Sequence, residues 1–143
     1  MPEESTTPDL VELVRRFVES ASSGDLDAML RFYAPVVVWE AADLGTSFAG
    51  VPAIRGFLED WLSGYETYEI EPEEILDLGN GVVFAVTRQN ARPAGSTGGA
   101  LVQEVWLYVF VWVEGMVARV AVYRDIAEGR AAAELLAEER ADV

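Results

Sequence analysis

The sequence predicts an α+β domain in which a bent antiparallel sheet wraps on helices. Three observations lead to this fold class. Apolar residues recur at helical spacing in most of the chain up to residue 63, whereas residues 68–123 alternate with the period of two that is typical of strands. One further helical segment follows. The chain has 143 residues and shows no internal repeat or linker, so we expect one domain over residues 1–143.

The N-terminal part predicts three helices and one strand. Thr7 can cap the first helix, and Gly24 ends it. Its apolar stripe consists of Leu10, Leu13, Val14, Phe17, Val18 and Ala21. A short second helix starts at Asp25, a buried strand covers residues 36–39, and a third helix begins near Pro52.

The second part predicts four strands and a last helix. The strands are expected over residues 68–78, 82–92, 100–113 and 116–123, with loops over residues 43–50 and 93–99. Pro72 requires a bulge or an edge position, and the sequence Gly79-Asn80-Gly81 is a strong hairpin signal. Asp125 and Glu128 resemble a capping box that opens a helix reaching about Glu139.

The composition excludes several classes of function. Ten arginines and no lysine stand against 25 acidic residues, and the net charge of −15 argues against nucleic-acid and membrane partners. Cysteine and histidine are absent, which excludes thiol and histidine catalysis and the usual zinc sites, so we expect no metal and no cofactor. The acidic run 66–77 indicates a solvated strand face, with a calcium site as the alternative. The acidic N-terminus is unlike a signal peptide, so we expect a cytoplasmic protein.

The strand pattern over residues 101–113 is apolar on both faces. One face carries Glu104, Trp106, Tyr108, Phe110 and Trp112, and the other carries Gln103, Val105, Leu107, Val109, Val111 and Val113. A single layer of helices covers only one face of a sheet. We therefore expect the aromatic face to line the core and the valine-rich face to meet a second subunit in a symmetric dimer.

Glu104 is the one acidic residue on the aromatic face. An unpaired buried carboxylate is costly, and Arg88 on the preceding strand is the natural partner. Three interpretations stay open: a structural ion pair, a pocket acid that orients a ligand or moves a proton, and simple exposure. The register between the two strands is not fixed by the sequence.

Four segments carry a family resemblance. They are GDLDAMLRFYAPVVVWE, VPAIRGFLEDW, the PAGSTGG loop, and VEGMVARVAVYRD followed by a helix. With the order of elements, they resemble the SnoaL-like group of the nuclear transport factor 2 superfamily over nearly the whole chain. The resemblance implies a cone-shaped fold, in which a curved, antiparallel or mixed sheet wraps on three N-terminal helices beside a C-terminal helix. It also implies an interior apolar pocket and usually a dimer. Members include steroid isomerases, polyketide cyclases, dehydratases and epoxide hydrolases.

Most of the catalytic residues that the resemblance implies have no equivalent in this sequence. Steroid isomerases have a tyrosine where Phe17 stands and a basic aspartate where Ala41 stands, so only their second acid has an equivalent, Glu104. The Arg-x-Asp pattern of the epoxide hydrolases reads Arg88-Gln89-Asn90 here, and their last aspartate falls at Val122. The cyclases and dehydratases rely on histidine, which this chain lacks.

The remaining residues define a candidate pocket. The candidate ligand-binding residues are Phe17, Tyr33, Trp39, Phe57, Trp61, Asn90, Trp106, Tyr108, Phe110 and Tyr123, and the candidate catalytic residues are Glu104 and Arg88. Glu40, Asp43 and Arg124 are expected at the solvated surface, with the mouth of the pocket as the alternative.

Three functions compete for this pocket. The first is binding of a small lipophilic molecule, such as a polyketide-, terpenoid- or steroid-like compound, without chemistry. The second is a proton-transfer enzyme of the isomerase, cyclase or hydrolase type, which uses Glu104 with Arg88 or a tyrosine. The third is a dimeric interaction module whose core is filled by its own side chains.

Overall fold

The computed structural model describes residues 9–22, 24–42, 45–93 and 102–141, and it confirms the predicted α+β class. The elements are α1 (Leu10–Ser22), α2 (Leu26–Leu30), β1 (Tyr33–Ala41), β2 (Thr46–Ala49), α3 (Val51–Ser63), β3 (Tyr65–Gly79), β4 (Val82–Pro93), β5 (Val102–Val113), β6 (Met116–Tyr123) and α4 (Ile126–Ala141).

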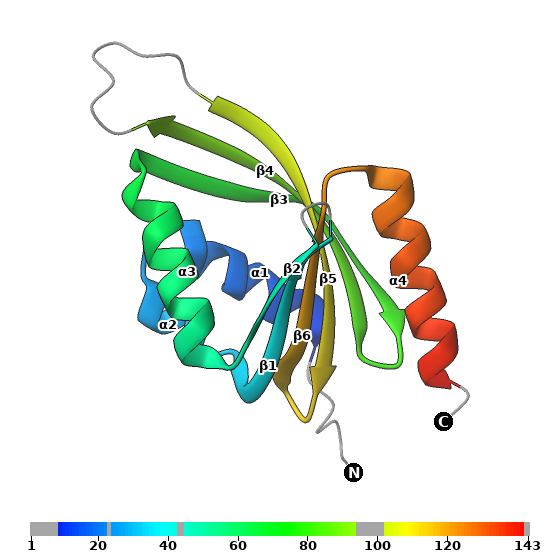
Figure 1. The fold of residues 1–143 in the computed structure, drawn as a ribbon. Helices are drawn as coiled ribbons and strands as arrows, with labels where there is room; N and C mark the ends of the chain where they lie inside the picture. The colour runs from blue at the N-terminus through cyan, green and yellow to red at the C-terminus, as the bar shows by residue number, and fades with distance from the viewer. Residues whose placement is uncertain (1–8, 23, 43–44, 94–101, 142–143) are drawn as a thin grey trace.

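A six-stranded sheet separates two layers of helices (Figure 1). Its strand order is β2-β1-β6-β5-β4-β3, and neighbouring strands are antiparallel except for β1 and β6, which are parallel. The sheet is open and ends at β2 and β3. Helices α1, α2 and α3 lie on one face, called the inner face here, and α4 lies on the opposite, outer face. None of the described helices is long and apolar enough to cross a membrane.

Carboxylates cap the starts of three helices. The carboxylate of Asp9 accepts a hydrogen bond from the backbone N–H of Glu12 at 3.2 Å, that of Asp25 from Ala28 at 3.0 Å, and that of Asp125 from Glu128 at 2.9 Å. The cap at Asp125 confirms the start predicted for the last helix. Thr7, the cap expected for α1, lies outside the described residues.

The predicted bulge and hairpin are present, and one edge strand, β2, was not predicted. The register between β3 and β4 shifts just after Pro72, which confirms the expected bulge. Asn80 and Gly81 have φ of 59° and 83° in the hairpin, and a Cβ on Gly81 would lie 2.5 Å from the carbonyl oxygen of Trp112. Strand β2 replaces part of an expected loop, because an edge strand of four residues leaves hardly any alternation to read.

The outer face of the sheet is covered by α4, which corrects the argument for a dimer. The buried members of this outer core are Val82, Phe84, Val86, Leu107, Val109, Ala121, Ala133 and Ala137. At Gly129 the helix comes so close that an added Cβ would lie 3.2 Å from the Cβ of Tyr123. The expectation that no helix is left to cover the valine-rich row is therefore wrong. The dimer itself stays a prediction that now lacks this support.

Candidate functional site: a cavity under the inner face

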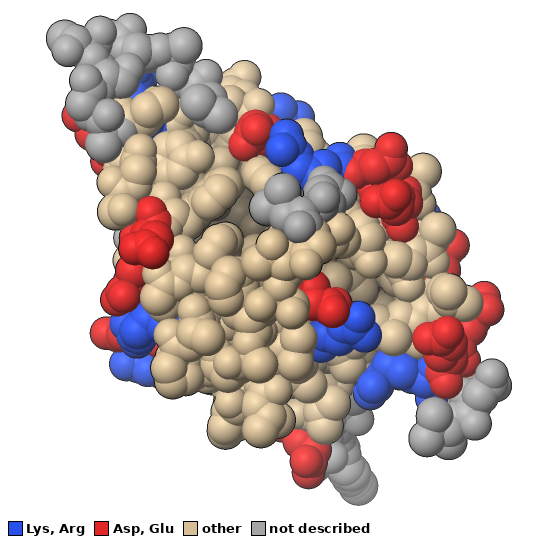
Figure 2. All heavy atoms as spheres, in the orientation of Figure 1, with Lys and Arg blue, Asp and Glu red and all other residues tan. Residues whose placement is uncertain are grey.

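A cavity of about 420 Å³ opens between α3 and the inner face of the sheet. It is lined by Trp39, Ala41, Phe57, Leu58, Trp61, Tyr65, Tyr68, Gln89, Glu104, Trp106, Tyr108, Val122 and Arg124. Figure 2 shows a hollow in the molecular surface that is bordered mostly by uncharged residues. The volume falls within the range of about 300–1,000 Å³ that small-molecule sites commonly have.

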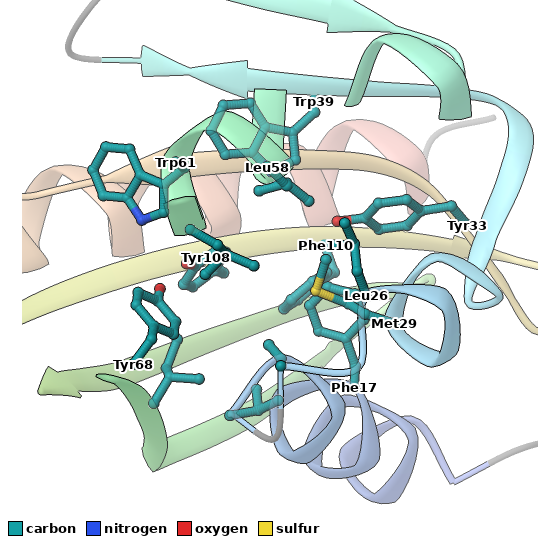
Figure 3. Close-up of a pocket in the computed structure, with 15 residues that line it drawn as sticks. Phe17, Leu26, Met29, Tyr33, Trp39, Leu58, Trp61, Tyr68, Tyr108 and Phe110 are labelled. Atoms are coloured by element: carbon teal, nitrogen blue, oxygen red, sulfur yellow. The ribbon is translucent and has the colours of Figure 1, made fainter. Parts of the chain in front are cut away.

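A smaller chamber of about 60 Å³ continues the cavity toward α1 and α2 (Figure 3). The two spaces share Trp39, Leu58, Trp61, Tyr68 and Tyr108 as lining residues, so these side chains form the boundary between them. The smaller chamber is lined in addition by Phe17, Val18, Ala21, Gly24, Leu26, Met29, Tyr33, Leu62, Ile70 and Phe110.

Strand alternation directs the lining residues inward. On β5 the residues Glu104, Trp106 and Tyr108 share one face, and they lie beside residues of the same face on both neighbouring strands. Gln89 of β4 pairs with Glu104, and Val122 of β6 pairs with Tyr108. The cavity wall is therefore continuous across three strands.

Glu104 lies on the inner face, as predicted, but its partner differs from the expected one. Its Oε2 accepts a hydrogen bond from Nη2 of Arg124 at 3.1 Å. Arg88 pairs in register with Val105 and donates from Nε to Glu73 at 2.7 Å. Since consecutive residues of a strand point to opposite faces, Arg88 lies on the face opposite Glu104. The expected Glu104–Arg88 pair is wrong, because the register that the sequence left open places Gln89, not Arg88, opposite Glu104.

Arg124 connects Glu104 to the aromatic wall. Its guanidinium carbon lies 4.6 Å from the ring centroid of Trp106, which is the geometry of a cation–π contact. The side chains of Arg124 and Glu104 are 51% and 28% exposed, so the pair sits where the cavity meets solvent. Arg124 thus balances the carboxylate of Glu104, which lines the cavity, and covers a tryptophan face at its mouth.

A second polar pair lies deeper in the wall. The hydroxyl of Tyr68 donates a hydrogen bond of 2.8 Å to Oε1 of Gln89, whose side chain is almost completely buried, with 1% exposed. Within the described part of the chain, Nε2 of Gln89 has no hydrogen-bond partner, and neither has the buried indole nitrogen of Trp106. Both residues line the cavity. Such unpaired buried donors are rare in folded proteins, which marks this wall as a place where a polar ligand atom would be stabilised.

The phenols of the cavity stay protonated at neutral pH. Burial raises the pKa of Tyr68 to about 12. Burial also raises the pKa of Tyr108 and of Tyr33 well above the ordinary tyrosine value, because a phenolate in an apolar site loses its hydration. In Figure 3 the hydroxyls of Tyr33 and Tyr68 point toward the space between the labelled side chains. The protonated phenol of Tyr33 can therefore donate a hydrogen bond there, whereas that of Tyr68 already donates to Gln89, and both are poor bases.

Most of the predicted pocket residues meet at one of the two spaces. Trp39, Phe57, Trp61, Trp106 and Tyr108 line the larger cavity, and Phe17, Tyr33 and Phe110 line the smaller chamber.

Asn90 and Tyr123 line neither space, which corrects their assignment. Asn90 lies on the outer face and accepts a hydrogen bond from Gln103 at 3.0 Å. Tyr123 belongs to the outer core and packs against α4 at Gly129.

Seven residues that line the larger cavity were absent from the predicted set: Ala41, Leu58, Tyr65, Tyr68, Gln89, Val122 and Arg124. Tyr68 and Gln89 were recognised only as strand residues, and Arg124 was expected at the solvated surface. Strand alternation places Gln89 on the same face of β4 as Ala85 and Thr87, and this could be read from the sequence. The sequence did not show which face of β4 is the inner one, because β4 is buried on both sides.

The charged residues near the strand ends have separate roles. Glu40 accepts hydrogen bonds from Arg119, the shorter at 2.7 Å, and lines neither space. Asp43 lies outside the described residues. Among the residues that the structure describes, no three acidic side chains gather closely enough to hold a metal ion.

Comparisons with known proteins agree with this architecture. Residues 14–120 match the model of the SnoaL-like domain. An NTF2-like protein of unknown function from Burkholderia pseudomallei is 18% identical, with a TM-score of 0.71 over 85% of this chain and 95% of that one. A protein described as a candidate polyketide cyclase from Xanthomonas campestris is 23% identical, with a TM-score of 0.64 over 82% and 90% of the two chains.

A third similar structure contains a ligand. TerC, co-crystallised with polyporic acid, is 15% identical, with a TM-score of 0.68 over 87% of this chain and 97% of that one. At these identities the likeness shows the fold alone. No curated protein matches the sequence.

Proposed function

The chain belongs to the SnoaL-like domain family, and within that fold we propose that it binds a small lipophilic molecule in the 420 Å³ cavity without transforming it. The observation that carries this proposal is the combination of an aromatic wall with unpaired buried donors at Gln89 and Trp106. Apolar lining with a few placed polar groups is the usual form of a small-molecule site.

The wall favours a flat, ring-containing ligand. Trp61 contacts Trp106 edge to face at 6.0 Å between ring centroids, and Phe57 lies 4.9 Å from Trp39. Rings arranged in this way offer several faces and edges against which another ring can pack. A polyketide-, terpenoid- or steroid-like molecule has this character, and TerC, which shares the fold, was crystallised with polyporic acid.

The polar groups favour binding over catalysis. The raised pKa of Tyr68 and of Tyr108 keeps both phenols protonated, so neither takes a proton at neutral pH. Glu104 is already paired with Arg124, and the family's histidine is absent.

The test is a titration of the chain with fluorenone, a flat aromatic ketone, followed by tryptophan fluorescence. Three of the four tryptophans line the cavity, so we expect saturable quenching. Val122→Phe fills the cavity from β6 and should weaken binding about tenfold or more, whereas the same change at the exposed Val113 should not. Absence of saturable quenching in the unmodified chain, or equal effects of the two variants, would overturn the proposal.

Proton transfer by Glu104 is the second candidate, favoured by the position of its carboxylate in the cavity wall. Indanone has exchangeable protons beside its carbonyl, and their exchange with deuterated water can be followed by NMR. Under the binding proposal the protein does not accelerate this exchange. Acceleration that disappears in Glu104→Gln would replace binding with proton transfer as the function.

A further inference from the structure

We propose that Gln89 is the specificity-determining residue of the cavity and that the ligand presents a carbonyl-type oxygen to its Nε2. This inference rests on the proposed function, because it names the class of molecule that the cavity selects. The expected ligand is thus a flat, apolar ketone or quinone rather than a hydrocarbon or an amine.

The burial of Gln89 makes its amide unusual. The side chain is 1% exposed and lines the cavity, and among the described residues nothing accepts a hydrogen bond from its Nε2. A donor left unpaired in the protein interior destabilises the folded state. Because Nε2 is covered by neighbouring atoms, a small adjustment of the side chain must accompany ligand entry. The acceptor would then supply the hydrogen bond that the protein itself does not provide.

Tyr68 determines which end of the amide is available. Its hydroxyl donates to Oε1 of Gln89 at 2.8 Å. Burial raises the pKa of Tyr68 to about 12, so this donor keeps its proton at neutral pH. With Oε1 occupied by Tyr68, the NH₂ group is the end of the amide that is left to bond a ligand atom once the side chain adjusts, and Tyr68 acts as a positioning residue.

The neighbours of Gln89 also favour an acceptor on the ligand. Trp106 is its diagonal neighbour across β4 and β5, and its indole N–H is a second buried donor without a partner in the described structure. The carboxylate of Glu104, which pairs in register with Gln89, already accepts a hydrogen bond from Arg124 at 3.1 Å. A cationic ligand would have to compete with that guanidinium for the carboxylate. A carbonyl oxygen would instead accept from a donor that has no partner among the described residues.

The experiment compares fluorene with fluorenone, which have the same ring system and differ by one carbonyl oxygen. Binding is followed by NMR of the indole N–H signals in nitrogen-15-labelled protein. We expect the unmodified chain to bind fluorenone about tenfold or more tightly than fluorene, the ratio that one hydrogen bond to a buried donor commonly gives. Gln89→Leu should bind both compounds equally well. Asn90→Leu, a matched change on the outer face, should keep the preference.

The side-chain amide gives a direct second readout. The chain has two glutamines and two asparagines, so the NH₂ signals of Gln89 can be assigned by their loss in Gln89→Leu. Fluorenone should shift these signals and fluorene should not. Tyr68→Phe should reduce the preference for fluorenone while fluorene binding stays unchanged, whereas a merely structural role would weaken both. Where Gln89→Leu does not fold, Gln89→Met and Tyr68→Phe provide the same comparison.

The outcomes separate this inference from the proposed function. If the unmodified chain binds both compounds with equal affinity, the role of Gln89 is overturned and the binding proposal stands. If it binds neither, the binding proposal fails. The isomer 9-aminofluorene, whose benzylic amine is protonated at neutral pH, tests a cationic ligand, and tighter binding of that compound than of fluorenone would also overturn the acceptor assignment.

Discussion

The polar residues of the cavity differ in how completely they are paired. Glu104 and Arg124 form a partly exposed ion pair at the mouth, and Tyr68 with Gln89 forms a buried pair that leaves one amide nitrogen unused. The first pair is satisfied by the protein itself. In the second pair, the Nε2 atom of Gln89 has no hydrogen-bond partner among the described residues. We therefore assign ligand recognition to Gln89 rather than to Glu104, the acidic residue that the sequence analysis singled out.

Glu104→Gln should change the free energy of unfolding by less than about 1 kcal/mol, because its pair with Arg124 is partly exposed to solvent. A urea unfolding curve of the variant beside the unmodified chain checks this. Breaking a truly buried pair costs about 3–5 kcal/mol, so a loss of that size would mean that Glu104 is a structural residue of the core.

Alkaline pH should destabilise the fold through Tyr68. Its pKa is raised by burial from 10.0 to about 12, so the folded chain holds this proton more tightly than the unfolded chain does. The stabilisation is fully present below pH 10 and is lost as the pH rises toward 12. Tyr33 and Tyr108 add to the loss in the same direction. Urea unfolding at several pH values should show a shallower alkaline decline in Tyr68→Phe, and an unchanged slope would contradict the burial of this phenol.

At the scale of elements, β4 and β5 are covered on both sides. Helices α1, α2 and α3 cover the inner face, and α4 covers the outer face. Helix α4 can approach the sheet because Gly129, Ala133 and Ala137, spaced four residues apart, form its buried side. Leu136 packs against the same core but is only partly buried, so the fully buried side of the helix consists of small residues.

Ala133→Leu should destabilise the fold by about 1–3 kcal/mol, because Ala133 is fully buried between α4 and the sheet and the larger side chain overpacks that contact. Ala131→Leu on the exposed side of the same helix is the matched control and should change stability by about 0.5 kcal/mol or less. Thermal melts compare the two variants. Equal stability of both would show that α4 does not pack on the outer face in solution.

The sequence predicts the elements more fully than their contacts. The start of α4, the Asn80-Gly81 hairpin and the bulge at Pro72 follow from local chemistry, and the structure confirms them. The aromatic face of β5 also follows from alternation. The partner of Glu104 does not, because pairing depends on a register that no local signal in β4 reveals. The face covered by α4 was missed because its small residues carry no apolar stripe.

At the scale of the whole molecule, the fold is that of the SnoaL-like family, and the cavity is lined by this chain's own aromatic and polar side chains. At the two positions where the sequence resemblance implies the tyrosine and the basic aspartate of the steroid isomerases, this chain has Phe17 and Ala41, and Phe17 lines the smaller chamber. The fold therefore supplies an enclosed space under a curved sheet, while the residues in it decide between binding and chemistry.

The variant Val109→Arg tests whether Val109 is buried in the outer core of one chain, as in this structure, or in an interface between two chains, as the dimer prediction assumed. Val109 is 3% exposed and belongs to the outer core, so an arginine there should unfold the chain rather than yield a folded monomer. Circular dichroism of the variant, together with light scattering of the unmodified chain, checks both points. A folded Val109→Arg variant would contradict the outer core, and a monomeric unmodified chain would contradict the dimer.

The most direct test of the central claim follows the four indole N–H signals of the intact chain during a titration with fluorenone. Trp39, Trp61 and Trp106 line the cavity, and Trp112 is buried away from it. If a ligand binds in the cavity, the first three signals shift saturably and the signal of Trp112 stays constant. Unchanged signals, or a uniform drift of all four, would contradict binding in the cavity.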